Sequence, residues 1–235
     1  MRQTSQTLPE GVIPHFGLYG ESIVSNDPGF VHIEDIAARS EENGWLIKPH
    51  RHNNMFQILC MVDGQLELQL DEHNHSLAGG WVITIPPGVV HGFRFRPDTE
   101  GAVLTLAEPL LTAGRYQRSR RYFGELIGTP HIIEFQRQSV LFDQLLQYLG
   151  LIARECKQSQ TGYEFMLEWL VGMVLVALKR QFDQQRLQTT VSVPSSKLLK
   201  GFRTLLEDNF RKHWKVQQYA AALHTSVSSL NRLCK

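Results

Sequence analysis

Cysteine is scarce in this 235-residue chain, and the three that occur form no motif. Cys60, Cys156 and Cys234 are far apart and odd in number, so the sequence indicates neither a disulfide framework nor a thiolate zinc site. A long apolar segment is also missing, because the most apolar run, Phe165 to Leu178, contains Glu168 and is too short to cross a bilayer. The N-terminus has no apolar core of signal-peptide length. We therefore expect a cytoplasmic protein without a membrane partner.

The motifs of several enzyme classes are absent as well. The sequence contains no GxSxG nucleophile elbow, no phosphate-binding Walker loop, no HExxH zinc motif and no GxGxxG dinucleotide loop. Cys60 lies in an apolar segment, where a cysteine is more often a small buried side chain than a nucleophile. We predict no catalytic residue of these kinds and expect a protein that is not an enzyme.

Charge is distributed unevenly, although the formal net charge is only +1. Residues 1–110 carry 6 Lys/Arg against 14 Asp/Glu, whereas residues 195–235 carry 8 against 2. A basic tail of this kind is typical of a segment that meets a polyanion, and equally of a helical segment with a solvated basic face. Charge alone leaves both interpretations open.

The first hundred residues have the pattern of antiparallel strands. In residues 65–70 polar residues alternate with leucines, as in a strand with one buried face. Asp63-Gly64 stands before this strand and predicts a tight hairpin turn. Further strands are expected at 30–36, 56–62, 80–85 and 102–106, and the set predicts an antiparallel sandwich or barrel.

The middle of the chain is helical in pattern. Residues 140–157 carry an apolar stripe at intervals of four, with Leu145 and Leu149 at its centre. Residues 163–182 are apolar around most of the helix. We expect these two helices to cover the open end of a barrel or to pair with a second subunit.

Two histidine and glycine patterns lie within the predicted strands. They read Gly44-x5-His50-x-His52-x4-Gln57-x6-Gly64 and Gly80-x5-Pro86-x-Gly88-x2-His91. His50 and His52 are two positions apart in an extended segment, so their rings point to the same face, and the turn at 86–88 lets His91 face them. Three imidazoles with the amide oxygen of Gln57 are enough protein ligands for a divalent metal.

These patterns resemble, in every spacing, the two motifs of the cupin superfamily of small double-stranded β-barrels. Gln57 stands where the first motif has glutamate, and Phe95 where the second has asparagine. The resemblance implies a cupin barrel with a mononuclear metal site, as in cupin dioxygenases and isomerases, at His50, His52, Gln57 and His91. Because a neutral amide does not balance the charge of a dication, the same residues are alternatively the lining of a pocket that holds no cofactor.

The basic tail predicts two short helices after a linker at 187–196, LQTTVSVPSS, and a further helix at 198–210. The first short helix spans 216–223, and Ser226 is a suitable N-cap for the second. The inward-facing residues are expected to be Val216, Tyr219, Ala220, Leu223, Leu230 and Leu233. Two short helices joined by a tight turn form either a helix-turn-helix or a plain helical hairpin.

The second short helix would present a polar face, formed by Ser228, Ser229, Asn231, Arg232 and Lys235. Asparagine and arginine recognise adenine and guanine edges in the major groove by paired hydrogen bonds. Lys235, with Lys212 and Lys215 nearby, suits phosphates. These residues are therefore candidates for contacts with DNA.

The tail pattern resembles the first half of the DNA-binding domain of the AraC/XylS family of bacterial transcription regulators. It reads Val216-x2-Tyr219-Ala220-x2-Leu223-x2-Ser226-x3-Leu230-x-Arg232. The resemblance places Ser228, Asn231 and Arg232 where the family contacts bases. The family's domain has two helix-turn-helix units, whereas this chain stops at Lys235 inside the first. We therefore expect specific DNA affinity to be weak or lost.

Three segments of the front half narrow the resemblance: HFGLYGE at 15–21, FVHIEDIAARS at 30–40 and HGFRF at 91–95. They are similar to regulators of aromatic-acid catabolism, including activators of 4-hydroxybenzoate use. The resemblance implies a small aromatic carboxylate as the effector. Arg51 or Arg94 would then meet its charge.

We therefore predict an α+β chain with four parts: a cupin-type effector-binding barrel at 1–110, a helical dimerisation region at 111–186, a linker at 187–196 and a partial helix-turn-helix at 197–235. The predicted function is that of an effector-responsive, homodimeric DNA-binding regulator, an activator of aromatic-compound catabolism. The effector-binding residues would be His50, Arg51, His52, Gln57, His91 and Arg94. The alternative is a metal-dependent cupin enzyme that uses His50, His52 and His91.

Overall fold

The computed structural model describes residues 27–112, 116–158 and 160–188, and, further on, residues 201, 202, 205, 206, 209, 212 and 214–233. The segment 15–21, most of the predicted linker, Cys234 and Lys235 lie outside the described residues. The chain divides into two compact units, one ending at Gln185 and the other beginning at Arg186. Every helix of the described part is too short or too polar to span a bilayer.

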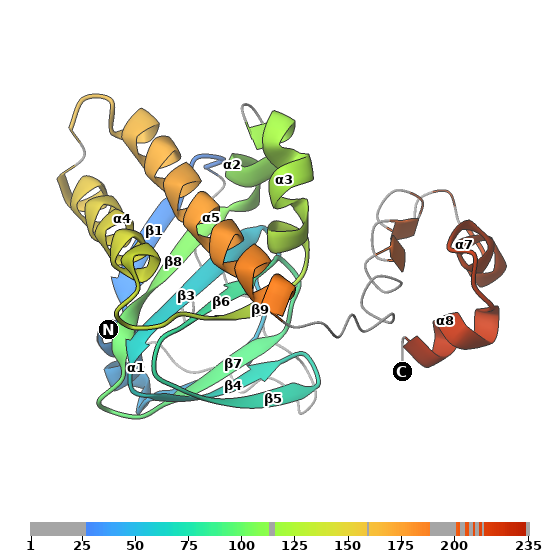
Figure 1. The fold of residues 1–235 in the computed structure, drawn as a ribbon, viewed down its shortest axis with the longest axis horizontal. Coiled ribbons are helices and arrows are strands. Elements are labelled where there is room, and N and C mark those ends of the chain that lie inside the picture. Colours follow the sequence, from blue (N-terminus) through green and yellow to red (C-terminus); the bar gives the residue numbers. More distant parts are fainter. Residues whose placement is uncertain are drawn as a thin grey trace, which may run out of the picture. The chain divides into compact units, whose positions relative to one another are not determined.

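Two antiparallel sheets form the first unit (Figure 1). The five-stranded sheet has the order β1-β8-β3-β6-β9, and the four-stranded sheet has the order β2-β7-β4-β5. The strands are β1 (Val31–Asp35), β2 (Leu46–His50), β3 (Met55–Asp63), β4 (Gln65–Leu70), β5 (His73–Ala78), β6 (Trp81–Ile85), β7 (His91–Phe95), β8 (Glu100–Ala107) and β9 (His131–Glu134). The predicted α+β fold, an antiparallel sandwich followed by helices, is confirmed.

Alternation along the strands divides the buried side chains between two cores. The inner core lies between the two sheets and contains Leu59 and Met61 of β3, together with Leu66, Leu68, Ile83, Ile85, Phe93 and Phe95. The residues of β3 that alternate with these, Phe56, Ile58 and Cys60, belong to an outer core on the other face. Burial raises the pKa of the Cys60 thiol to about 12. Cys60 is therefore a core residue, as its sequence context suggested.

The predicted hairpin at Asp63-Gly64 is wrong. β3 pairs with β6 and β8, whereas β4 pairs with β5 and β7. The chain therefore crosses from one sheet to the other at Gly64. A side chain is excluded there, because φ is 102° and an added Cβ would lie 2.5 Å from the Cα of Thr99.

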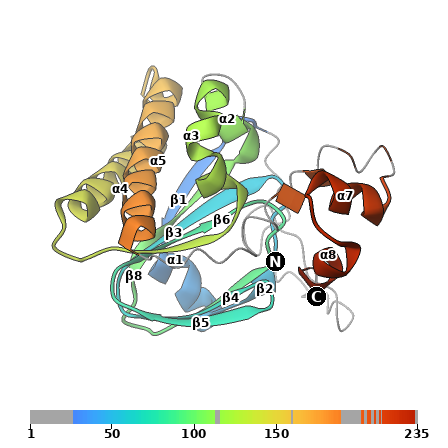
Figure 2. The ribbon, with the colours of Figure 1, turned by 45° about the vertical axis from the view of Figure 1, so that its right-hand side comes forward.

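The predicted helices at 140–157 and 163–182 correspond to α4 (Val140–Gln158) and α5 (Tyr163–Gln188). They lie over the outer face of the five-stranded sheet, with α3 (Tyr116–Gly128) beside α5 (Figures 1 and 2). Leu145 and Leu149 are buried in the outer core. The two helices therefore cover the outer face of the five-stranded sheet, contrary to the expectation that they close the barrel's open end. Their pairing with a second subunit stays a prediction. The remaining short elements are α1 (Ile36–Ser40), η1 (Glu41–Asn43) and α2 (Glu108–Thr112).

The second unit contains the two predicted short helices, α7 (Val216–Ala222) and α8 (Val227–Leu233). They enclose a small core of Tyr219, Ala220 and Leu230, with Phe202, Leu205, Trp214, Leu223 and Val227 packed against it. Val216 is 46% exposed, contrary to its expected inward position. The N–H of Ser229 donates to the Oγ of Ser226 at 3.0 Å, which confirms Ser226 as the cap of α8.

Candidate functional site

Three histidines converge in the interior of the first unit. One ring nitrogen from each of His50, His52 and His91 lies within 4.8 Å of the other two. The ring centroids are 4.3 Å apart for His50 and His91, 4.9 Å for His50 and His52, and 5.2 Å for His52 and His91. All three residues are at most 2% exposed. The structure thus brings together the three histidines that the two sequence patterns single out.

Strand pairing and one loop contact create this cluster. β2 and β7 are antiparallel neighbours, and His50 is the register partner of His91. His52 follows β2, and its carbonyl accepts a hydrogen bond from the N–H of Gly88 at 2.7 Å. The loop after β2 is thereby tied to the turn before β7, which brings His52 to the other two rings.

Backbone carbonyls orient two of the imidazoles. The Nδ1 of His50 lies 2.8 Å from the carbonyl oxygen of Lys48, and the Nδ1 of His91 lies 2.9 Å from that of Val89. Because a carbonyl oxygen only accepts, each Nδ1 carries the proton, and the Nε2 of the neutral ring keeps a lone pair. The Nε2 of His91 is buried without a hydrogen-bond partner in the described part of the chain. This atom can accept a hydrogen bond from a ligand or coordinate a cation.

Burial keeps these imidazoles neutral. Burial lowers the pKa of His50 to about 4; the carbonyl of Lys48 raises it and the proximity of His52 lowers it further. Burial, reinforced by His50 and His52, also holds the pKa of His91 well below its ordinary value. Near pH 7 both rings are therefore in the uncharged form that ligates a metal or accepts a hydrogen bond.

Gln57 lies on the interior face of β3, in alternation with Leu59, and is 7% exposed. Its Nε2 donates to the Oγ1 of Thr105 at 3.3 Å. This hydrogen bond occupies an N–H donor of the amide and leaves its oxygen as an acceptor. Thr105 was not among the predicted site residues, because only the pairing of β3 with β8 brings it to Gln57.

The two candidate arginines have different positions. Arg94 lies between the inward-facing Phe93 and Phe95 on β7, so it points outward, and its Nε lies 3.1 Å from the Oε2 of Glu67. This position is contrary to the expectation that Arg94 meets an effector carboxylate inside the barrel. Arg51 adjoins the histidine cluster in sequence and is partly exposed.

The donor set fits a divalent metal ion. Neutral imidazoles whose Nδ1–H is held by a backbone carbonyl are the usual arrangement of metal-bound histidine, and borderline divalent metals accept such ligands. His50, His52 and His91 would hold the ion, with the oxygen of Gln57 as a further neutral ligand. In the described part of the chain the potential metal-binding group consists of these three histidines, without a carboxylate.

The candidate DNA contacts in the second unit also differ in position. Ser228 and Asn231 are exposed on α8, as predicted. Ser229 is partly buried and bonds to Ser226 through its N–H and its hydroxyl, so it belongs to the helix cap. The side chain of Arg232, like the whole of Lys235, lies outside the described residues.

Comparison with known proteins finds a partial match in the barrel. Residues 39–107, the segment that contains both histidine motifs, match the family model of the Cupin domain. No curated protein matches the chain. Similar solved structures include KdgF from Halomonas sp., which is 28% identical with a TM-score of 0.25, over 26% of this chain and 56% of that chain.

Two further similar structures extend over more of the chain. The AraC-like transcriptional activator CuxR is 11% identical with a TM-score of 0.40, over 77% of this chain and 60% of that chain. ToxT from Vibrio cholerae is 8% identical with a TM-score of 0.41, over 86% and 73%. This chain spans less than two thirds of the length of KdgF and of CuxR.

Proposed function

We propose that this chain is an effector-responsive DNA-binding transcription regulator. The second unit carries the proposal: α7 and α8, each of seven residues, share a core of their own and meet at a tight turn next to the Ser226 cap. Two short helices joined in this way are the arrangement with which many regulators enter the major groove. Metal-dependent chemistry at His50, His52 and His91 would not require such a unit.

The outward face of α8 supports the same proposal. Ser228 and Asn231 are both exposed and three positions apart, so they lie on one side of the helix. Asparagine can pair with an adenine edge, and Arg232, next in sequence, with guanine. The excess of Lys and Arg in residues 195–235 would attract the phosphate backbone.

The barrel would supply the sensor. Neutral, buried imidazoles can accept hydrogen bonds from a hydroxyl group, and Phe93 and Phe95 line the same interior with apolar surface. We propose a small aromatic carboxylate as the effector and activation of aromatic-compound catabolism as the output. Because Arg94 faces outward, we propose Arg51, which lies between His50 and His52 in sequence, as the arginine that meets the carboxylate. The regulator would act in the cytoplasm as a homodimer. A dimer carries two copies of the helix-turn-helix unit, which can bind two paired half-sites on the DNA.

Binding to duplex DNA as a function of salt tests the proposal without knowledge of the operator. We expect the logarithm of the binding constant to fall linearly with the logarithm of the salt concentration, as phosphate contacts require. Lys215→Gln should reduce this slope by about one. Lys157→Gln, at the end of α4, is the matched control and should leave the slope unchanged. Absence of DNA binding at low salt, or an equal change of the slope in both variants, would refute the proposal that the second unit binds DNA.

The histidine cluster favours one second candidate, a metal-dependent cupin enzyme. The observation behind it is the buried, unpartnered Nε2 of His91 beside two further imidazoles. A bound metal would supply Lewis-acid or redox chemistry, while His50, His52 and His91 would hold it and the apolar barrel wall would limit access of water. Stoichiometric iron, manganese, zinc or nickel in the purified protein, lost in His50→Ala/His52→Ala, would favour this candidate over a metal-free sensor.

A further inference from the structure

A row of polar side chains crosses the inner face of the five-stranded sheet. His32 on β1 is the register partner of Thr105 on β8, which is also the register partner of Gln57 on β3. The row faces the four-stranded sheet, because the residues that alternate with it, such as Ile33 and Leu104, belong to the outer core. Neighbouring strands are about 4.8 Å apart, so the row extends about 10 Å from Gln57 to β1. It therefore continues the polar part of the barrel interior to the edge strand of this sheet.

Two hydrogen-bonding groups of this row have no partner in the described part of the chain. The Nε2 of His32 is buried without a hydrogen bond. The hydroxyl of Thr105 accepts from the Nε2 of Gln57 at 3.3 Å, but it donates to none of the described residues. Thr105 is 1% exposed, and the next residue of β8 on the same face is the apolar Val103. Because a buried polar group without a hydrogen bond costs folding free energy, these two groups indicate a site for a ligand.

A charged pair lies beside His32. The Oε2 of Glu34 is 3.6 Å from the Nε2 of His32, which is too far for a hydrogen bond. Arg39 holds this carboxylate, with its Nη2 and its Nε each 3.0 Å from the same oxygen. The ring of Phe30 stacks on that of His32, with the centroids 6.2 Å apart. These neighbours give the imidazole a defined position at the β1 end of the row.

The same carboxylate limits what can bind to His32. A ligand carboxylate at the Nε2 of His32 would also face the negative Oε2 of Glu34, and like charges repel each other. A hydroxyl group is uncharged, and it both donates and accepts hydrogen bonds. It can accept the hydrogen of the Thr105 hydroxyl, and it can bind the Nε2 of His32 in either tautomer. The chemistry of the row therefore selects a hydroxyl group.

We infer that His32 and Thr105 bind a hydroxyl substituent of the effector, in addition to the contacts proposed for the histidine cluster. The inference rests on the proposed role of the barrel as the sensor. The carboxylate of the ligand would point away from Glu34. An aromatic acid without the hydroxyl would leave both groups unpaired, and a site built for a hydroxyl rejects such a ligand strongly. His32 and Thr105 thereby determine which aromatic acids act as effectors.

Calorimetric titration of the full chain with two probes tests this inference. The probes are the isomer of hydroxybenzoate that binds most tightly and benzoate, which has no hydroxyl. The unchanged chain should prefer the hydroxybenzoate by at least about tenfold. His32→Phe keeps a ring for stacking on Phe30. It should reduce the preference at least about fivefold and leave the dissociation constant of benzoate within about twofold. Thr105→Val removes only the hydroxyl at nearly the same volume and should act in the same way.

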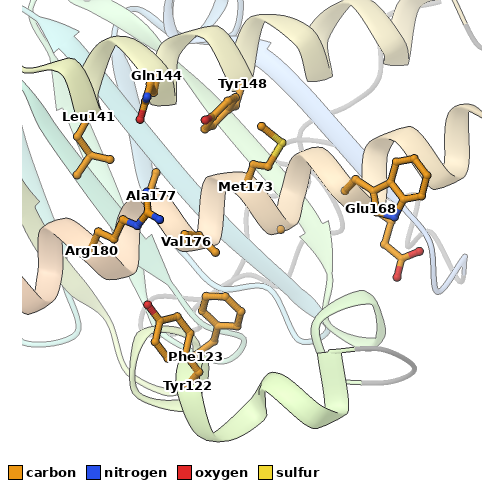
Figure 3. Close-up of a pocket in the computed structure, with 12 residues that line it drawn as sticks. Tyr122, Phe123, Leu141, Gln144, Tyr148, Glu168, Met173, Val176, Ala177 and Arg180 are labelled. Carbon is orange, nitrogen blue, oxygen red and sulfur yellow. The ribbon is translucent and has the colours of Figure 1, made fainter.

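Matched variants separate this role from other effects. His73→Phe replaces an exposed histidine on β5, in the other sheet, and should change neither dissociation constant. Met173→Glu alters a groove of about 630 Å³ between α3, α4 and α5, which Tyr122 and Tyr148 also line (Figure 3). It should change neither constant, because the ligand binds inside the barrel. Circular dichroism should show the same fold in every variant.

Three results would overturn the inference and leave the sensor in place. They are an undiminished preference in both His32→Phe and Thr105→Val, an equal loss of affinity for benzoate in these variants, and an unchanged chain that binds both acids equally. Loss of hydroxybenzoate binding in Met173→Glu would place the ligand in the groove and would also overturn it. A chain that binds neither benzoate nor any hydroxybenzoate would refute the proposed aromatic effector itself, and the inference with it.

Discussion

His50 and His91 are register partners on the adjacent strands β2 and β7, and their ring centroids lie 4.3 Å apart. Two imidazoles at this distance in a buried site cannot easily both be protonated, because each charge would lack solvation and repel the other. The folded site therefore favours the neutral form of histidine. We expect this preference to affect the stability of the barrel at low pH and the binding of ligands to the imidazoles.

The first prediction concerns stability against pH. The pKa of His50 is about 4 when folded, against 6.5 for the ordinary side chain, so acid favours the unfolded chain. The stabilising contribution is complete above pH 6.5 and is lost as the pH falls towards 4. Between pH 7.5 and 5.5 the free energy of unfolding should decrease by about 1.4 kcal/mol from His50 alone, as urea denaturation would show. The slope should be smaller in His50→Asn, and a slope equal to that of the unchanged protein would contradict the neutral buried histidine.

The second prediction concerns the effector. In a thermal-shift screen, at least one hydroxybenzoate should raise the melting midpoint, because a ligand of the folded state stabilises it by about 2.7 kcal/mol at 100 times its dissociation constant. The shift should disappear in His91→Ala, whose buried Nε2 faces the site. Arg94→Ala should keep the shift, because Arg94 points out of the barrel and pairs with Glu67. No shift with any hydroxybenzoate would remove the aromatic-carboxylate proposal.

The third prediction concerns the crossing between the two sheets. Gly64 and Gly88 both have positive φ, at 102° and 80°, so alanine is strained at either position. Only at Gly64 does an added Cβ also collide with backbone, because nothing lies within 4 Å of one at Gly88. Gly64→Ala should therefore lower the free energy of unfolding by at least about 1 kcal/mol more than Gly88→Ala. An equal loss of unfolding free energy in the two variants, measured by urea denaturation, would contradict this prediction. It would show that the backbone at Thr99 moves away from the added Cβ without loss of stability.

The fourth prediction concerns the helix cap in the second unit. Ser226→Ala should destabilise this unit by about 1 kcal/mol, since the Oγ of Ser226 accepts the N–H of Ser229. Hydrogen exchange of the α8 amides should accelerate about fivefold. Asn231→Gln, on the exposed side of the same helix, serves as the control and should leave exchange unchanged. Similar acceleration in both variants would argue against a specific role of the cap.

Sequence periodicity was sufficient for much of this fold and for the histidine cluster. Alternation located β4, and the four-residue stripe located α4. The histidines could be predicted because their spacing within two motifs determines where a strand places them. The same alternation in HGFRF places Arg94 on the opposite face of β7 from His91, Phe93 and Phe95. The alternation alone therefore predicts that Arg94 points out of the barrel.

Long-range pairing was the part that local sequence did not specify. Asp63-Gly64 marks a change of direction, but the partner strand of β4 depends on contacts with β5 and β7. β5 itself, HNHSLA, has too few apolar residues for its alternation to be visible. The hydrogen bond from Gln57 to Thr105 likewise joins residues 48 positions apart. For the same reason, the packing of α4 and α5 on the sheet could not be distinguished from closure of the barrel.

Coupling between the barrel and DNA is the most direct test of the proposed regulator. The dissociation constant for duplex DNA should be measured with and without the hydroxybenzoate that gives the largest thermal shift. We predict a change of at least about fivefold in the unchanged chain, the lower end of typical coupling between two sites, and no change in His91→Ala. An identical dissociation constant with and without a ligand that demonstrably binds the barrel would contradict effector-responsive DNA binding.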